Sequence, residues 1–81
     1  MLNVFFLKLA LELLEEIVET SSREAPLYYV MGKLCKRMNM PDKALSYLTL
    51  ALDLDTKNAN VIKAAIDNLQ QPDEDDNFEL L

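Results

Sequence analysis

The hydrophobic and polar positions of this chain divide it into four stretches with helical periodicity, separated by short polar breaks. The first stretch, residues 3–19, is apolar around most of the predicted helix. Its polar stripe recurs at steps of three and four residues and consists of Lys8, Glu12, Glu15, Glu16 and Glu19. A helix with so much apolar surface is normally covered on more than one side. We therefore expect neighbouring helices on two faces of this first helix.

The second and third helices are predicted over Ala25–Met38 and Asp42–Leu52. Pro26 suits the first turn of a helix, where the missing amide hydrogen does no harm. Residues 39–42 form a tight turn between the two helices. The inner side of the third helix is predicted to consist of Ala44, Leu45, Leu48, Ala51 and Leu52.

A fourth helix is predicted over residues 59–69, and an acidic tail follows it. Its apolar face consists of Val61, Ile62, Ala65, Ile66 and Leu69. From Pro72 onward the chain is short of apolar residues, which is typical of disorder. Five acidic residues lie in this tail, and without them the net charge of −6 would fall to −1.

The most diagnostic spacing lies around Gly32, the only glycine of the chain. Large residues and a glycine on one helix precede alanine, leucine and alanine on the next, as in a tetratricopeptide repeat. The signature residues are Tyr28, Met31, Gly32 and Cys35, followed by Ala44, Leu48 and Ala51. A glycine inside a helix costs about 1 kcal/mol relative to alanine. Its presence here predicts a close crossing of the two helices at that position.

The repeat spacing also predicts how the chain is divided. Counting back about 34 residues, the usual repeat length, places Ala10 opposite Ala44 and Leu14 opposite Leu48. Residues 1–20 then form the second helix of a preceding partial repeat, and residues 25–58 form one complete repeat. Residues 59–71 form a C-terminal packing helix, and residues 72–81 the tail. The predicted fold is all-α: tetratricopeptide-repeat helical hairpins, a fragment of an α-solenoid, with a disordered acidic C-terminal tail.

A longer series of segments flanks this repeat. It comprises Ala10-Leu11-x-x-Leu14-Glu15-Glu16 and Ile17-Val18, Tyr28-x-x-Met31-Gly32-Lys33 with Lys36, Ala51-x-Asp53-Leu54-Asp55-x-Lys57, Ile62-Lys63-x-Ala65-Ile66-Asp67, and Pro72-Asp73-Glu74. Together these segments resemble the C-terminal repeats and tail of the third subunit of the anaphase-promoting complex, the cell division cycle protein 27 type. The resemblance covers roughly residues 10–76. Its most distinctive part is the exit from the last helix into Pro-Asp-Glu.

The resemblance implies a non-catalytic scaffold in a cell-cycle ubiquitin ligase that acts during mitosis in the nucleus and cytoplasm. Its implied partners are other subunits of that complex and the C-terminal Ile-Arg tails of coactivator subunits. Members of this family are many times longer than 81 residues. We therefore expect a fragment, a truncated gene model or a short isoform.

In repeats of this kind the first helix of each hairpin lines the concave surface. Here the concave positions are Pro26, Tyr29, Lys33 and Lys36, with Arg37 beside them. The candidate peptide-binding residues are Tyr29, Lys33, Lys36 and Arg37. The basic residues could hold a carboxylate through charge-assisted hydrogen bonds, or they could form a solvated face that complements the helix dipole. Two other functions stay open: a stand-alone module that binds acidic or C-terminal peptides, and a nonfunctional truncated product.

The two phenylalanines near the start also allow two interpretations. Phe5 and Phe6 could belong to an interface with a missing repeat helix, or to a lipid-binding patch. The polar stripe of the same helix is acidic apart from Lys8, whereas membrane-surface helices are usually rich in lysine and arginine. We therefore favour the repeat interface.

Catalysis, metals and cofactors have little support in this sequence. There is no histidine and no glycine-rich phosphate loop, and Cys35 has no predicted base beside it. A calcium loop starting at Asp53 would need glycine and glutamate where Asn58 and Ala64 stand. We expect no enzyme activity, no cofactor and no bound metal.

Nucleic acids and membranes are not expected partners either. There is no clustered basic surface of the kind that binds nucleic acid. No uncharged apolar run approaches the roughly 20 residues that a membrane span needs, and no basic segment precedes the apolar start as in a secretory signal. The sequence therefore predicts a soluble intracellular protein.

Overall fold

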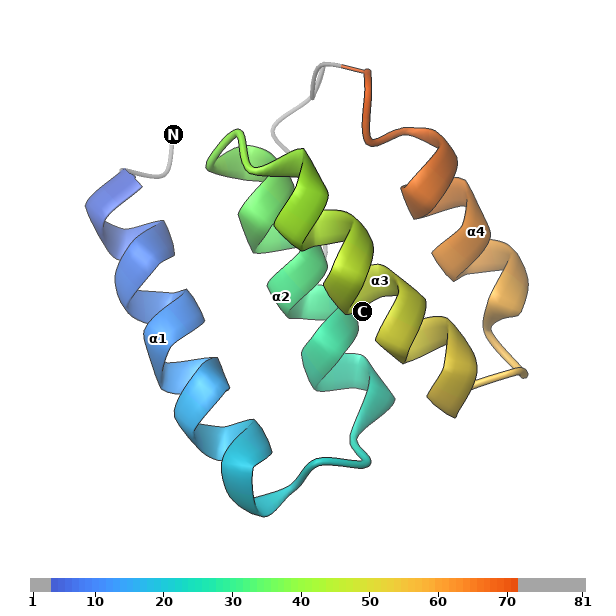
Figure 1. Ribbon diagram of the computed structural model, residues 1–81, viewed down its shortest axis with the longest axis horizontal. Coiled ribbons are helices and arrows are strands. Elements are labelled where there is room, and N and C mark those ends of the chain that lie inside the picture. The colour runs from blue at the N-terminus through green and yellow to red at the C-terminus, as the bar shows by residue number, and fades with distance from the viewer. Residues whose placement is uncertain (1–3, 72–81) are drawn as a thin grey trace.

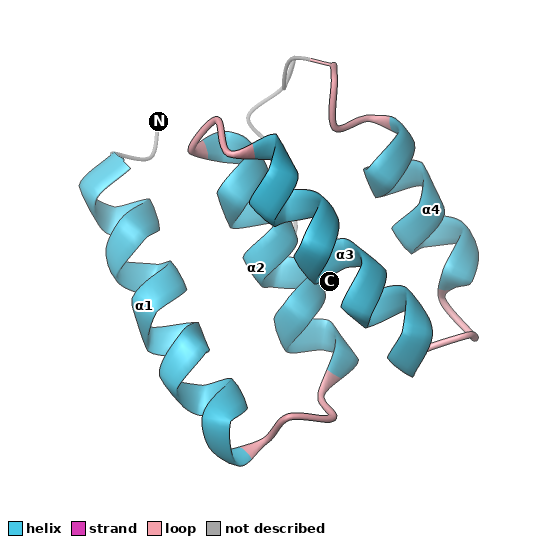
Figure 2. Cartoon of the chain, viewed as in Figure 1, coloured by secondary structure: helices cyan, strands magenta, loops and turns pink. Residues whose placement is uncertain are grey.

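The computed structural model describes residues 4–71, and within this range the chain forms four α-helices and no strand. They are α1 (Val4–Thr20), α2 (Ala25–Arg37), α3 (Pro41–Leu54) and α4 (Ala59–Asp67). Figures 1 and 2 show that short loops connect these helices. The predicted disorder of residues 72–81 lies outside the described residues.

The helices pack as neighbours in chain order. α2 and α3 form an antiparallel hairpin with the most extensive contact, while α1 lies against α2 and α4 lies against α3 (Figure 1). A stack in which each helix contacts its neighbours is the arrangement of tetratricopeptide hairpins. The predicted all-α hairpin fold is therefore confirmed.

Local chemistry explains where the hairpin turns. Pro26 and Pro41 lie in the first turns of α2 and α3, where proline fits best. Between them Asn39 adopts φ 62°, a left-handed conformation that asparagine tolerates better than most residues. This residue reverses the chain between α2 and α3.

The observed helix ends differ slightly from the predicted ones. α3 begins at Pro41 and ends at Leu54, two residues later than predicted. α4 ends at Asp67, earlier than the predicted Leu69. Leu69 nevertheless packs against the core as a partly buried side chain. The segment 59–71 thus contains a shorter helix followed by turns.

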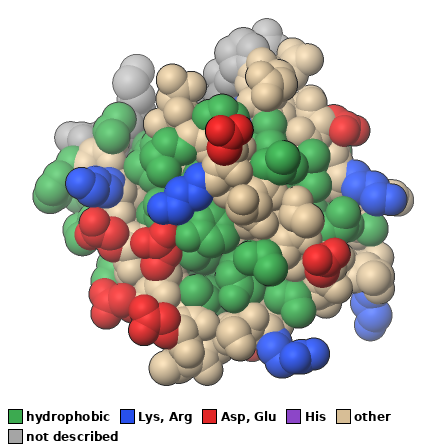
Figure 3. Space-filling view, in the orientation of Figure 1, with side chains coloured by type: hydrophobic (Ala, Val, Ile, Leu, Met, Phe, Trp, Pro, Cys, Tyr) green, Lys and Arg blue, Asp and Glu red, His purple; other side chains and the backbone are tan. Residues whose placement is uncertain are grey.

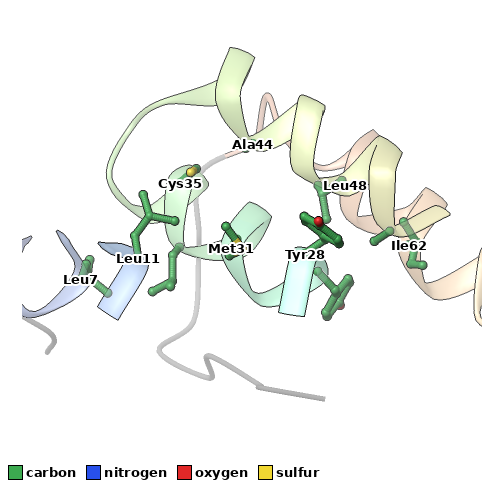
Figure 4. Close-up of a cluster of buried hydrophobic side chains, with 11 residues drawn as sticks. Leu7, Leu11, Tyr28, Met31, Cys35, Ala44, Leu48 and Ile62 are labelled. Carbon is green, nitrogen blue, oxygen red and sulfur yellow. The ribbon is translucent and has the colours of Figure 1, made fainter. Parts of the chain in front are cut away.

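The core runs along the hairpin and extends to both outer helices (Figure 4). Its fully buried centre comes from α2 and α3, and consists of Met31, Cys35, Ala44, Leu48 and Ala51. Leu7 and Leu11 join this centre from α1, and Ile62 joins it from α4. One continuous apolar cluster therefore holds the four helices together.

Three expectations about apolar side chains are wrong. α1 was expected to be covered on two faces, but only the face of Leu7 and Leu11 is buried. Leu45 and Val61 were expected to point inward, and they are 45% and 50% exposed. Helical periodicity predicts the direction of a side chain, but it does not predict whether a neighbouring helix covers that direction.

Candidate functional site: the hairpin crossing and the concave helix face

The two helices of the hairpin lie in close contact at Gly32. A Cβ atom built on Gly32 would lie 2.6 Å from Cγ and 2.8 Å from Cδ2 of Leu48. It would also lie 3.2 Å from the backbone oxygen of Ala44. These separations are shorter than van der Waals contact, so only glycine fits without displacing Leu48. Gly32 therefore lies where α2 and α3 leave no room for a side chain.

The side chain of Tyr28 contacts both the loop between α1 and α2 and helix α3 of the hairpin. Its hydroxyl donates a hydrogen bond of 3.1 Å to the backbone oxygen of Ser22. Its ring stacks on Tyr47 of α3, with centroids 6.3 Å apart and planes 24° apart. Buried tyrosines usually place the hydroxyl on a polar partner while the ring packs in the core. Tyr28 thus positions α1 relative to the hairpin.

A polar contact between α1 and α3 was not predicted from the sequence. The hydroxyl of Tyr47 donates to Oε2 of Glu15 over 2.7 Å, and Nζ of Lys43 lies 3.3 Å from the same oxygen. Burial raises the pKa of Tyr47, and its hydrogen bond to Glu15 raises it further. Glu15 had been assigned only to the polar stripe of α1. No local signal connects residues 32 positions apart.

Cys35 is a buried thiol rather than a reactive one. It is fully inaccessible to solvent, and it is unpaired with any other cysteine. Burial raises the pKa of its thiol from 9.0 to about 11; Lys43 lowers it by less, and Glu15 raises it slightly. The thiolate is the nucleophilic form of cysteine, and this raised pKa keeps the Cys35 thiol protonated at neutral pH.

This raised pKa predicts how stability depends on pH. The unfolded thiol loses its proton near pH 9.0 and the folded thiol near pH 11. Between these two pH values the unfolded state binds fewer protons than the folded state. The free energy of unfolding therefore falls as the pH rises through this window. The raised pKa of Tyr47 acts in the same direction. We expect urea unfolding midpoints to fall above about pH 9, and less steeply in Cys35→Ala. If a thiol-specific reagent labels Cys35 in the folded chain as fast as it does in urea, the thiol is not buried.

The candidate peptide-binding residues lie on α2, and the structure brings two of them together. Nζ of Lys33 lies 5.5 Å from the ring centroid of Tyr29, within the range of a cation–π contact. Lys36 and Arg37 are half-buried in the last turn of the same helix. Tyr29 was expected on an open surface, but it is only 7% exposed.

Tyr29 lines a pocket between the start of α2 and the start of α4. The pocket measures about 420 Å³ and is lined by Ala25, Pro26, Tyr29, Asp55, Asn58, Val61 and Ile62. Lys33, Lys36 and Arg37 do not line it. The sequence placed Tyr29 and Pro26 on the concave side but gave no sign that α4 would complete a hollow there. The pocket offers mainly apolar walls and one acidic side chain.

Asp55 shapes the α4 side of this pocket. Its Oδ2 accepts a 2.7 Å hydrogen bond from the Asn58 side-chain amide, and its Oδ1 accepts from the backbone amides of Lys57 and Asn58. The Asn58 amide holds the pKa of Asp55 below its usual value, and the backbone amides add to this. The carboxylate therefore fixes the turn that begins α4.

Residues 4–71 contain neither a candidate metal centre nor a candidate membrane span. No group of three or more histidine, cysteine, aspartate or glutamate side chains in this range is arranged to hold a metal ion. None of the helices described there has both the length and the apolar character required to cross a bilayer.

The glycine crossing, the hairpin and the stacked outer helices define a helical-repeat protein of the tetratricopeptide class. Three relatives extend this assignment. The chain is 47% identical over 68 residues to anaphase-promoting complex subunit 3 of Dictyostelium discoideum. It is 46% identical over 64 residues to cell division cycle protein 27 homolog B of Arabidopsis thaliana, and 37% identical over 65 residues to anaphase-promoting complex subunit 3 of Schizosaccharomyces pombe.

These alignments cover 84%, 76% and 80% of this chain. The predicted resemblance is confirmed: the chain carries tetratricopeptide sequence of the anaphase-promoting complex subunit 3, or cell division cycle protein 27, type. The chain spans only 7%, 9% and 10% of the lengths of these three relatives. It matches no protein-family model and no solved structure.

Proposed function

We propose that this chain is a non-catalytic protein-interaction scaffold that associates with subunits of an anaphase-promoting complex. The observation that carries the proposal is the 47% identity to a subunit 3 over 84% of the chain. The proposal places the chain in mitotic control and the ubiquitin pathway, in the nucleus and cytoplasm. Its partners would be other subunits of the complex, through helix faces, and coactivator C-terminal tails, through the concave side. Nucleic acids and membranes are not among its proposed partners.

The fold supports this proposal because the hairpin leaves helix surfaces for other chains. The side chains closest to Gly32 serve packing, and the buried thiol of Cys35 is held neutral. Outside the core, the chain presents a pocket beside Tyr29 and an open face on α1. Concave repeat surfaces of this kind bind extended segments of partner proteins.

The test is affinity purification of the tagged full chain from dividing cells, with subunits of the complex quantified by mass spectrometry. Gly32→Leu serves as the matched control, because it changes one residue and is expected to lose the hairpin. Enrichment of these subunits with the parent chain alone would support the proposal. Equal recovery with both chains, or no recovery with either, would overturn it.

A second candidate function is a stand-alone module that binds acidic or C-terminal peptides. The pocket favours it, because an apolar peptide side chain could enter beside Tyr29 while its carboxylate approached Lys33. Such a clamp would weaken strongly as salt rises, since charge pairs at a surface are screened.

For this clamp we expect the double substitution Lys33→Glu and Lys36→Glu to weaken peptide binding at least about tenfold. The reason is that two cations that attract a carboxylate become two anions that repel it. Fluorescence anisotropy with labelled acidic C-terminal peptides measures the effect. Lys57→Glu with Lys63→Glu, which changes two exposed lysines near α4, is the charge-matched control. Unchanged affinity in the α2 variant would show that the lysines form only a solvated surface.

A further inference from the structure

A pocket and a row of basic side chains lie along the same face of α2. Tyr29 lines the pocket together with Val61 of α4, and Nζ of Lys33 lies 5.5 Å from the Tyr29 ring centroid. Lys36 and Arg37 follow in the last turn of the helix. Steps of four and three residues place Tyr29, Lys33 and Lys36 on one face. This face of α2 therefore runs from an apolar hollow at its start to positive charge at its end.

Residues 72–81, the acidic tail, carry the matching features in the opposite order. Four acidic residues come first, at positions 73–76, and Phe78, Leu80 and Leu81 come last; this segment has no basic residue. In an extended chain Phe78 and Leu80 share one side, and Glu79 lies on the other. An apolar side chain of the tail can then enter a pocket while Glu79 stays in water.

The chain also leaves α4 beside the basic end of α2. Both α2 and α4 run antiparallel to α3, so they finish at the same end of the stack (Figure 1). A tail that turns back towards the start of α4 meets the basic residues first and the pocket last. α4 has nine residues and is about 14 Å long, whereas the chain from Gln71 to Phe78 can span about 23 Å. Phe78 can therefore reach the pocket.

We propose that the acidic tail docks on this face of α2 within the same chain. Its acidic half lies along the basic residues, and Phe78 enters the pocket beside Tyr29. Carboxylates form strong, charge-assisted hydrogen bonds with lysine and arginine. Burial of an apolar side chain in a mainly apolar hollow is favourable because it removes that side chain from water.

Charges elsewhere along the route fit this direction. Beside the starts of α2 and α4, two basic residues accompany two acidic ones: Arg23, Lys57, Glu24 and Asp55. These four charges cancel, so this end suits the apolar half of the tail. On α4, Lys63 and Asp67 lie one turn apart and offset each other. The excess of positive charge lies at the end of α2, where the acidic half of the tail begins.

The exposed apolar face of α1 is a poorer dock for this segment. It includes Phe6, Leu13 and Ile17, but acidic side chains gather over the same helix (Figure 3), and like charges repel. α1 also lies on the opposite side of the hairpin from α4 (Figure 1). Charge and position therefore both direct the acidic tail to α2.

Docking of the tail regulates access to the concave side. A partner segment that binds beside Tyr29 and Lys33 must first displace the acidic tail. This consequence rests on the proposed function, because it requires that partners use the concave side. The docking itself requires no partner, so it can be measured on the chain alone.

Phe78→Trp reports the docking in the full chain, which has no tryptophan of its own. We expect the tryptophan to emit at a shorter wavelength in buffer than in urea, because the docked ring is removed from water. Leu80→Trp, on the same side of the tail, is the second reporter in case the larger ring at position 78 does not fit. Emission in buffer equal to that in urea for both reporters would overturn the proposal.

Lys36→Glu, made in the reporter chain, tests the charged half of the dock. Lys36 is chosen because Lys33 contacts the Tyr29 ring, and its replacement would also disturb the pocket. We expect the ratio of docked to undocked chains to fall about fivefold, and to fall also at high salt. Lys8→Glu is the charge-matched control, since Lys8 is an exposed residue of α1. Equal shifts of the emission in the two variants would overturn the proposal.

Val61→Asp, made in the reporter chain, tests the apolar half. Val61 lines the pocket and is 50% exposed, so the change adds a charge to the pocket wall without opening the core. We expect the emission to move to the value in urea. Leu50→Asp is the matched control, since Leu50 is 44% exposed on α3 and does not line the pocket. Circular dichroism verifies that both variants keep their helices.

An emission that Val61→Asp leaves unchanged, or that both variants shift equally, would overturn the pocket as the docking site and with it the proposal. A docked tail in a chain that recovers no other subunit would keep this inference and lose the proposed function. Recovery of subunits by a chain whose tail is undocked would do the reverse.

Discussion

Replacing Gly32 with leucine is expected to destabilise the hairpin so far that it unfolds on mild heating. Even a Cβ atom at this position would lie 2.6 Å from Leu48 Cγ, and leucine adds three further carbons in the same space. Overpacking by a few methylene groups already costs about 1–3 kcal/mol. A chain of this length has a total stability of about 4–12 kcal/mol. Loss of most of the circular dichroism signal at 222 nm on mild heating measures the effect.

Two other substitutions make the result specific to this crossing. Gly32→Ala is expected to destabilise by about 1–3 kcal/mol, although alanine would stabilise an ordinary helix by about 1 kcal/mol relative to glycine. Ala64→Leu introduces the same leucine at an exposed position of α4 and is expected to change stability by less than about 0.5 kcal/mol. If Gly32→Ala proves more stable than the parent chain, the close approach of α2 and α3 is incorrect.

The hairpin could be predicted because its signals are local. Pro26 and Pro41 mark helix starts, and the spacing around Gly32 specifies a close crossing within one repeat. Only the helix ends were misplaced, by up to about two residues. Helix ends respond to tertiary contacts as well as to sequence, since the last turn of a helix frays easily.

The surroundings of the candidate site were less predictable because they depend on which helices meet. Tyr29 was expected on an open surface, and it is largely buried at a pocket that α4 completes. The contact of Glu15 with Tyr47 joins α1 to α3, and neither residue carries a local signal for the other. The proposed roles of Lys33, Lys36 and Arg37 remain predictions for the binding experiments above.

Truncating Leu48 is expected to produce the second large loss of stability. Leu48 is 1% exposed and packs over Gly32 in the centre of the hairpin, and Leu→Ala at such positions costs about 2–5 kcal/mol. Leu50, two residues further along α3, is 44% exposed, so Leu50→Ala should cost only about 0.5 kcal/mol. Urea unfolding followed by circular dichroism measures both. Equal losses would mean that α3 is rotated from the described orientation.

A double-mutant cycle that combines Gly32→Ala with Leu48→Ala tests the contact between these two residues. Leu48→Ala removes Cγ and Cδ2, the two atoms nearest to a Cβ on Gly32, and leaves the Ala44 backbone oxygen at 3.2 Å as the remaining neighbour. The alanine of Gly32→Ala can then occupy part of the vacated space. We expect the double variant to be more stable than the sum of the single losses implies, by about 0.5–3 kcal/mol. Losses that simply add would show that Gly32 and Leu48 do not touch, and the glycine would then need another explanation.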